Sequence, residues 1–162
     1  MDSVLFPWTE DLSVGIDEID RQHRQLVDIL NHLFIAVVQR RSDQVVSETL
    51  DALLDYAQNH FHLEEELMRK AGFRGESFDQ HVCAHHAFMA KVDGIARKSL
   101  LENKTVAFEL MSFLKHWLRE HIRVTDKAYA HTLQAAGFCT RQWETEAREK
   151  IELQTRPWWK FW

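Results

Sequence analysis

The sequence predicts an all-α protein, an antiparallel up-down-up-down four-helix bundle with an irregular N-terminal arm and a C-terminal helical and aromatic extension. Three observations support this fold. The 162 residues include only five glycines and two prolines, so residues that form turns are scarce. Apolar residues recur at spacings of three and four over four segments of roughly 25 residues, as on the buried side of a helix. Short connections between these segments favour antiparallel neighbours.

The first three helices follow from these patterns in order. The first is expected over residues 16–40, with Asp17 placed to act as its N-cap, and the second over residues 42–69. The glycine-containing sequence AGFRG then interrupts the apolar pattern. The third helix is expected to open on Ser77, because Gln80 three residues later completes a capping-box pattern.

The fourth helix is expected to begin at Asn103 or Thr105 and to end at Gly137, with Val124 on its apolar stripe. Gly137 stands where a C-terminal cap is expected, and glycine tolerates the left-handed backbone of such a cap. Residues 1–137 are therefore expected to form one bundle domain, and its first fifteen residues to form the irregular arm.

Residues 138–162 are expected to be a separate C-terminal extension. Residues 140–153 could form a fifth, highly charged helix with a thin apolar stripe of Trp143, Ala147 and Ile151. The chain then ends in the aromatic sequence WWKFW. Such an end suits packing on the bundle, docking to a protein partner, or contact with a membrane surface. The sequence leaves these three alternatives open.

Composition excludes several classes of function. The net charge is −5 and the two signs are interspersed, so no nucleic-acid partner is expected. The longest uncharged apolar run, residues 33–38, is too short for a transmembrane segment, and the N-terminal sequence MDSVLFPWTE does not resemble a signal peptide. Cys83 and Cys139 form no disulfide or CxxC pattern, which favours the reducing cytoplasm.

Ten histidines are many for a chain of this length, and their positions are ordered. Each of the four expected helices carries at least one histidine on its apolar stripe. On the second and third helices, another polar residue follows one turn later, so that both side chains face the same way. The residues selected by this pattern are His23, His60, Glu64, His81, His85 and His121.

This pattern predicts a metal site in the core. A single histidine on an apolar stripe is more often an ordinary core residue, but that does not explain one on every helix. An unpaired buried carboxylate costs several kcal/mol, and an unsatisfied imidazole about 1–3 kcal/mol. A divalent transition metal accepts both groups as ligands, and so many ligands suit two octahedral ions better than one tetrahedral zinc. Ligands without thiolate suit iron, although ligand type alone also admits other metals.

Asp126 is a candidate ligand that spacing alone does not select. It follows His121 by five residues and lies about 140° away around a regular helix. Its carboxylate reaches the stripe only from the edge, or through a π-type turn. The remaining histidines are expected on the solvated face or to the side of the stripes and are assigned no role; they are His32, His62, His86, His116 and His131.

Four segments of the chain resemble the hemerythrin family, specifically the single-domain bacteriohemerythrins. They are IDEIDRQHRQL around His23, HFHLEEELM from His60, HVCAH from His81 and HWLREHIRVTD ending at Asp126. The resemblance covers about residues 8–131, and the segments occur in the order of the family. All the ligand positions of the family are filled.

The resemblance implies a cofactor of two non-haem iron ions joined by a bridging oxo or hydroxo group. It implies that one iron is bound by His81, His85 and His121. It implies that the other is bound by His23 and His60, and that Glu64 and Asp126 bridge the pair. The implied activity is reversible O2 binding, for carriage, storage or supply, rather than catalysis.

The O2 pocket must be dry, and Leu118, Phe61 and Trp117 are the candidates to line it, although ordinary core packing explains each of them equally well. Two alternative functions stay open. One is a di-iron enzyme acting on O2, peroxide or nitric oxide. No Glu stands three residues before any histidine, which argues against a ferritin-like enzyme but not against other di-iron enzymes. The other is an O2- or redox-responsive sensor or interaction module with the C-terminal tail as its output.

Overall fold

The computed structural model describes residues 4–41, 43–96 and 104–155, and within these residues it is all-helical, without a strand. After a short 3-10 turn at Glu10–Leu12, the elements are α1 (Asp17–Val38), α2 (Asp43–Lys70), α3 (Glu76–Ala96), α4 (Lys104–Glu120), a π-helical segment (His121–Asp126), α5 (Lys127–Ala135) and α6 (Arg141–Gln154). The predicted all-α class is confirmed.

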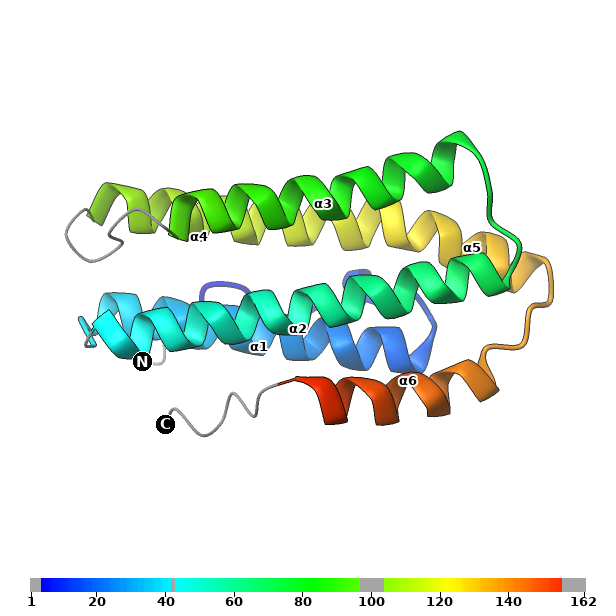
Figure 1. Ribbon diagram of the computed structural model, residues 1–162, viewed down its shortest axis with the longest axis horizontal. Helices are drawn as coiled ribbons and strands as arrows, with labels where there is room; N and C mark the ends of the chain where they lie inside the picture. The colour runs from blue at the N-terminus through cyan, green and yellow to red at the C-terminus, as the bar shows by residue number, and fades with distance from the viewer. Residues whose placement is uncertain (1–3, 42, 97–103, 156–162) are drawn as a thin grey trace.

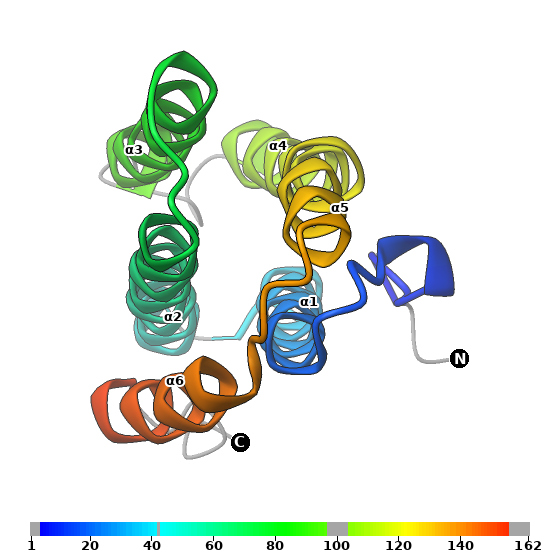
Figure 2. The ribbon, with the colours of Figure 1, turned by 90° about the vertical axis from the view of Figure 1, so that its right-hand side faces the viewer.

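The four longest helices, α1 to α4, lie side by side along the long axis of the molecule (Figure 1). The π segment and α5 continue the line of α4. The view along the helices shows α6 outside this group, against α1 and α2 (Figure 2). Each of the four long helices contributes apolar side chains to one central core, including Ile19, Leu67, Val92 and Leu110, all completely buried.

Two predicted helix starts were wrong in detail. Asp17 is the first residue of α1 rather than its N-cap, and Ile16 occupies the cap without a side-chain hydrogen bond. The helix α3 begins at Glu76, so Ser77 already lies inside it and Gln80 donates a hydrogen bond to Glu76 instead. The residue before α3 is a glycine in the left-handed conformation, which lets the chain enter the helix earlier.

The fourth predicted helix is interrupted, because the π-helical segment separates α4 from α5. A π turn contains one residue more than an α turn, so the residues that follow it are rotated relative to a regular helix. Val124, expected on the buried stripe, is consequently 62% exposed. The end of this helical run matches the prediction, since Gly137 has φ +68° directly after the C-cap residue Ala136.

Part of the C-terminal extension is well defined. It forms α6, whose stripe of Trp143, Ala147 and Ile151 is buried as expected. The aromatic end WWKFW lies outside the described residues. No helix in the described part of the chain is long and apolar enough to cross a membrane.

Trp143 is expected to be the main apolar anchor of α6, since only 4% of it is exposed. Replacing a buried Trp with alanine costs about 3–5 kcal/mol, and we expect the lower end because the indole Nε1 has no hydrogen-bond partner among the described residues. Urea unfolding of Trp143→Ala measures this loss. Leu153→Ala is the control, because Leu153 is 85% exposed and its replacement should change stability by less than about 0.5 kcal/mol.

Candidate metal centre

The structure brings all the side chains predicted as ligands into one buried region between α1, α2, α3 and the π segment. None of these residues is more than 6% exposed; they are His23, His60, Glu64, His81, His85, His121 and Asp126. The burial of so many polar groups is unusual in a core, where such groups normally have hydrogen-bond partners.

These side chains form two groups that share Glu64. In the larger group, ligand atoms of Glu64, His81, His85, His121 and Asp126 all lie within 4.8 Å of one another. In the smaller group, ligand atoms of His23, His60 and Glu64 meet the same limit. Each group could hold one metal ion, and Glu64 is placed to contact both.

Asp126 also faces both groups, one with each carboxylate oxygen. Its Oδ1 lies 3.1 Å from Nε2 of His121 in the larger group, and its Oδ2 lies 3.4 Å from Nε2 of His23 in the smaller group. The π segment explains this position. Residues five apart lie on the same side of a π turn, so Asp126 is brought round to the face that His121 occupies.

Two of the histidines are oriented by polar side chains that sequence reasoning missed. Nδ1 of His60 lies 2.8 Å from Oε1 of Gln22, and Nδ1 of His85 lies 3.0 Å from Oε1 of Glu65. An imidazole whose Nδ1 donates a proton keeps the lone pair on Nε2, which is then free to bind a metal. Nε2 of His85 does face the group, 3.3 Å from Oε2 of Glu64.

Tyr129 on α5 is a third missed residue. Its hydroxyl donates to Oε1 of Glu64 over 2.5 Å, and the ring is buried. Burial and the nearby Glu64 carboxylate raise the pKa of Tyr129 well above its usual value, so the hydroxyl stays a donor. The only sequence signal for Tyr129 is that it follows Asp126 by one helical turn. This spacing becomes informative only once Asp126 is known to face the site.

The electrostatics of the site give some of its groups the protonation states that metal ligands need. His85 is an exception: burial lowers its pKa, but hydrogen bonds to Glu64 and Glu65 outweigh this effect and raise it to about 9, so this imidazole must lose a proton when a metal binds. Burial and then the neighbouring His23 lower the pKa of His60 to about 3, so that this imidazole is neutral at pH 7. Burial raises the pKa of Glu64, but hydrogen bonds from histidines outweigh this effect and hold the pKa well below its usual range. Both Glu64 and Asp126, whose pKa is also lowered, are therefore ionised.

Several buried atoms at the centre have no hydrogen-bond partner among the residues that the structure describes. They are both ring nitrogens of His23 and both carboxylate oxygens of Asp126. In addition, Nε2 of His85 and Nε2 of His121 face each other over 2.9 Å. Buried nitrogen and oxygen atoms that converge without hydrogen-bond partners are costly unless a cation lies among them. The donor set therefore fits a pair of transition-metal ions.

Aromatic rings cover one side of the centre. The ring of Phe61 stacks on His85 at 3.9 Å between centroids, and Trp117 stacks on His121 at 4.2 Å. Phe61, Trp117 and Leu118, the three predicted pocket residues, all line one small cavity whose other walls are apolar side chains such as Leu114. The structure thus brings these three residues together next to the histidines.

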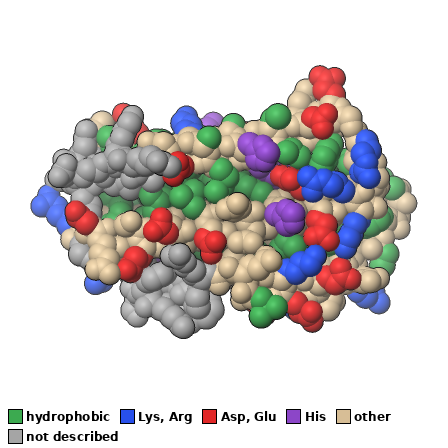
Figure 3. Space-filling model, viewed as in Figure 1, with side chains coloured by type: hydrophobic (Ala, Val, Ile, Leu, Met, Phe, Trp, Pro, Cys, Tyr) green, Lys and Arg blue, Asp and Glu red, His purple; other side chains and the backbone are tan. Residues whose placement is uncertain are grey.

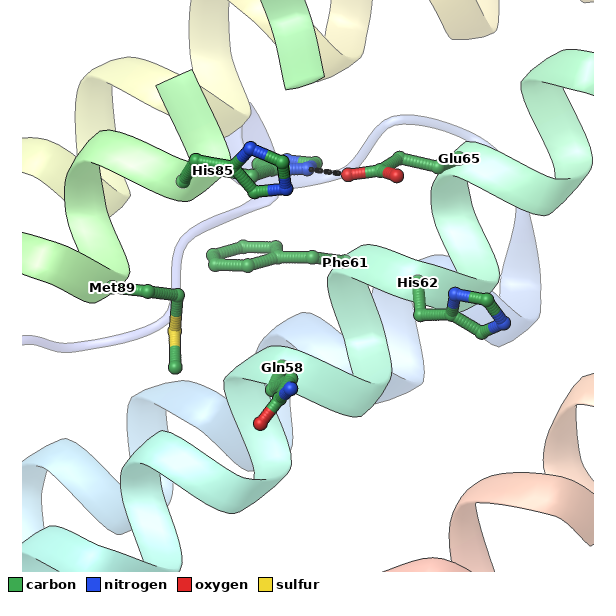
Figure 4. Close-up of a pocket in the computed structure, with 7 residues that line it drawn as sticks. Gln58, Phe61, His62, Glu65, His85 and Met89 are labelled. Atoms are coloured by element: carbon green, nitrogen blue, oxygen red, sulfur yellow. Dashed lines mark hydrogen bonds and ion pairs between the residues drawn. The ribbon is translucent and has the colours of Figure 1, made fainter. Parts of the chain in front are cut away.

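A second, wider hollow lies at the surface between α2 and α3. This groove has a volume of about 390 Å³ and reaches Phe61 and His85 at its base (Figure 4). Figure 4 also shows the hydrogen bond between His85 and Glu65 at its edge. On the face seen in Figure 3, histidine side chains lie near the middle of the molecule, and acidic and basic side chains are intermingled around them.

The histidines that were assigned no role lie outside the buried centre. His62, His86, His116 and His131 are exposed and His32 is half-buried. The buried histidines are those that lie on the apolar stripes of their helices, and the others lie off these stripes, as the helical spacing predicts.

Tyr129→Phe is expected to destabilise the protein by about 1–3 kcal/mol, because it removes a buried donor and leaves Oε1 of the ionised Glu64 unsatisfied. Urea unfolding of the iron-free chain measures the loss. Tyr56→Phe is the matched control, since Tyr56 is equally buried but donates to the neutral Gln25 at 3.1 Å. An equal loss in both variants would contradict a special role for the contact to Glu64.

Comparisons with known proteins agree with this chemistry. The family described as "Hemerythrin HHE cation binding domain" matches residues 14–133. A bacteriohemerythrin of Stenotrophomonas maltophilia is 37% identical over 131 residues, 81% of this chain and 83% of the relative. A bacteriohemerythrin of Pseudomonas aeruginosa is 34% identical over 78% of this chain and 80% of its own length. One of Methylococcus capsulatus is 30% identical over 81% of this chain and 98% of its own length.

Proposed function

Because the chain belongs to the hemerythrin family, we propose that it binds O2 reversibly at a non-haem di-iron centre and so carries, stores or supplies O2. The observation that supports this most directly is the pair of ligand groups that share Glu64. When bound, a ferrous pair supplies the electrons and the open coordination position that reversible O2 binding requires.

The proposed ligands divide between the two irons as the two groups do. One iron is assigned to His81, His85 and His121 and the other to His23 and His60. Glu64 and Asp126 are assigned as the bridging carboxylates, together with an oxo or hydroxo group. The contacts of Asp126 with both groups support its bridging role.

The surrounding residues serve this centre in three ways. Gln22 and Glu65 orient histidine ligands through their Nδ1 atoms. Tyr129 holds Glu64 through a hydrogen bond. The apolar walls of the cavity at Phe61, Trp117 and Leu118 exclude water from the open side. The frame for these contacts is proposed to be an up-down-up-down four-helix bundle within residues 1–137, with residues 138–162 as an extension.

A carrier or store is favoured over an enzyme by the small cavity behind Phe61 and Trp117, the rings that stack on His85 and His121. Its walls are apolar, which suits a small uncharged molecule such as O2 and offers no group to bind or orient a polar substrate. We also propose a cytoplasmic location, since Cys83 and Cys139 are both exposed free thiols, as is usual in a reducing compartment.

The test is anaerobic reduction of the iron-loaded protein followed by exposure to O2, with metal analysis and visible absorption on the same sample. Two irons per chain and an absorption band that appears with O2 and disappears on its removal are expected. One zinc per chain, without iron, would contradict the proposal. Rapid bleaching with turnover of an added substrate would instead indicate an enzyme.

A further inference from the structure

The helix α6 lies beyond residue 133, where the family match ends, yet it packs against the two helices that carry His23 and His60 (Figure 2). Ion pairs surround its apolar stripe. Lys150 contacts Glu66 on α2 at 3.0 Å, and Arg148 contacts Glu18 on α1 at 3.0 Å. The two contacts differ in whether the glutamate that is contacted is linked by further hydrogen bonds to the metal site.

Behind Arg148, a continuous series of hydrogen bonds leads to the metal site. Glu18 is completely buried, and its carboxylate accepts from Arg148 and from the amide of Gln22 at 2.7 Å. The carbonyl oxygen of Gln22 faces Nδ1 of His60 at 2.8 Å. Glu66, by contrast, is bonded to Lys70 and Lys150 and to no residue of the site.

The direction of each hydrogen bond in this series is determined by the carboxylate. An ionised carboxylate only accepts, so the NH2 group of Gln22 must point to Glu18 and its carbonyl oxygen must point to His60. That oxygen in turn requires a proton on Nδ1 of His60. The lone pair of His60 is then on Nε2, the nitrogen left for a metal.

We propose that α6 is part of the support of the metal centre, and that Arg148, Glu18 and Gln22 are positioning residues that set the tautomer and ring orientation of His60. This inference rests on the proposed di-iron function, because His60 is there assigned as a ligand. It extends the functional unit beyond the region that the family match covers.

The charges around Glu18 are arranged to keep it an acceptor. Burial raises the pKa of Glu18, but hydrogen bonds from Arg21, Gln22 and Arg148 outweigh this effect and lower it. Arg21 donates to both carboxylate oxygens from within α1, at 2.8 and 2.9 Å. Arg148 therefore acts as a second cation, contributed by α6, on the oxygen Oε2.

Glu18→Gln is the decisive variant, because it keeps the shape of the side chain but can donate as well as accept. Gln22 is then free to turn its NH2 group toward His60, which removes the constraint on Nδ1. Lys150→Gln is the matched control, since it removes an ion pair between α6 and α2 that leads to no ligand. Arg148→Gln removes one of the two cations at Glu18 and is expected to have a smaller effect than Glu18→Gln.

The full-length variants are loaded with ferrous iron under anaerobic conditions, and the rate of iron release to an excess of chelator is measured. Glu18→Gln is expected to release iron about tenfold faster than Lys150→Gln, as for other changes next to a metal-binding histidine. Adding Gln22→Glu to Glu18→Gln restores an acceptor-only group opposite His60 and is expected to restore slow release. Equal release from Glu18→Gln and Lys150→Gln would overturn the proposal.

A second readout separates this proposal from the proposed function. In the iron-free, 15N-histidine-labelled chain, NMR is expected to detect a proton on Nδ1 of His60 in the wild type and in Lys150→Gln, and a mixture of tautomers in Glu18→Gln. An Nδ1 without a proton in the wild type contradicts the positioning role even if the chain binds O2. A wild-type chain that holds no iron contradicts the proposed function, whatever the tautomer.

Discussion

Replacing Asp126 with alanine is expected to give a folded helical protein that has lost the iron pair, holding at most one iron per chain. Like Glu64, Asp126 has carboxylate oxygens close to the histidines of both ligand groups. Its removal leaves the smaller group with only two histidines, His23 and His60, and the shared carboxylate of Glu64. Metal analysis of the loaded and desalted protein measures the loss, and circular dichroism confirms the helical fold.

The same variant is expected to be less stable than the wild type at pH 7 when iron is absent, as measured by urea unfolding. Burial and the neighbouring Glu64 raise the pKa of Asp126, but interactions with His121 and His23 outweigh them and lower it to about 2, so the ionised carboxylate stabilises the folded state at pH 7. Val124→Ala is the control, because Val124 belongs to the same π segment but is 62% exposed. Two tightly held irons in Asp126→Ala would show that the carboxylate is not a bridging ligand.

Leu118→Asn is expected to make the O2-bound protein decay about fivefold faster, with little effect on iron content. Leu118 is 7% exposed and lines the apolar cavity together with Phe61 and Trp117, whose rings stack on His85 and His121. An amide in this wall gives water a hydrogen-bonding partner worth about 1 kcal/mol, which corresponds to about fivefold in the population of water at the site. The decay of the visible band in air measures the rate.

Leu118→Met serves as the control for this variant, since it conserves volume and apolar character. Its decay rate should stay within about twofold of the wild type. Equal decay of the Asn and Met variants would mean that exclusion of water at this wall does not limit the lifetime of the bound O2.

The sequence predicted most of the candidate site because helical phase is a local property. The stripe residues, among them His23, His60 and Glu64, have the spacings that bring side chains to one face of a helix. All of them are buried, as this spacing predicts. Asp126 could not be selected in this way. Apolar periodicity assumes regular turns, and the i to i+5 bonding of the π segment changes the phase within a few residues.

The polar residues around the ligands could not be predicted for a different reason. Gln22 on α1 contacts His60 on α2, and Tyr129 on α5 contacts Glu64 on α2. Such pairs depend on the rotation and offset of separate helices, which no spacing within one helix records. Glu18 and Gln22 do carry a weak signal, because two polar residues one turn apart share the apolar side of the first helix.

In the C-terminal extension, too, the sequence predicted the helix but not the contacts that it makes. The stripe of Trp143, Ala147 and Ile151 predicted a helix with one buried side, which α6 has. Packing on the bundle, on a partner and on a membrane require the same apolar stripe, so the pattern could not choose among them. The ion pairs of Arg148 and Lys150 with α1 and α2 add the specificity that the stripe lacks.

The most direct test of a reversible di-iron O2 site is an equilibrium titration of the reduced, iron-loaded protein with O2. Uptake of one O2 for every two irons, complete release under argon, and the same uptake in a second cycle are expected. Uptake that is not recovered on lowering the O2 pressure, or a protein with two irons that takes up no O2, would contradict a reversible di-iron O2 site.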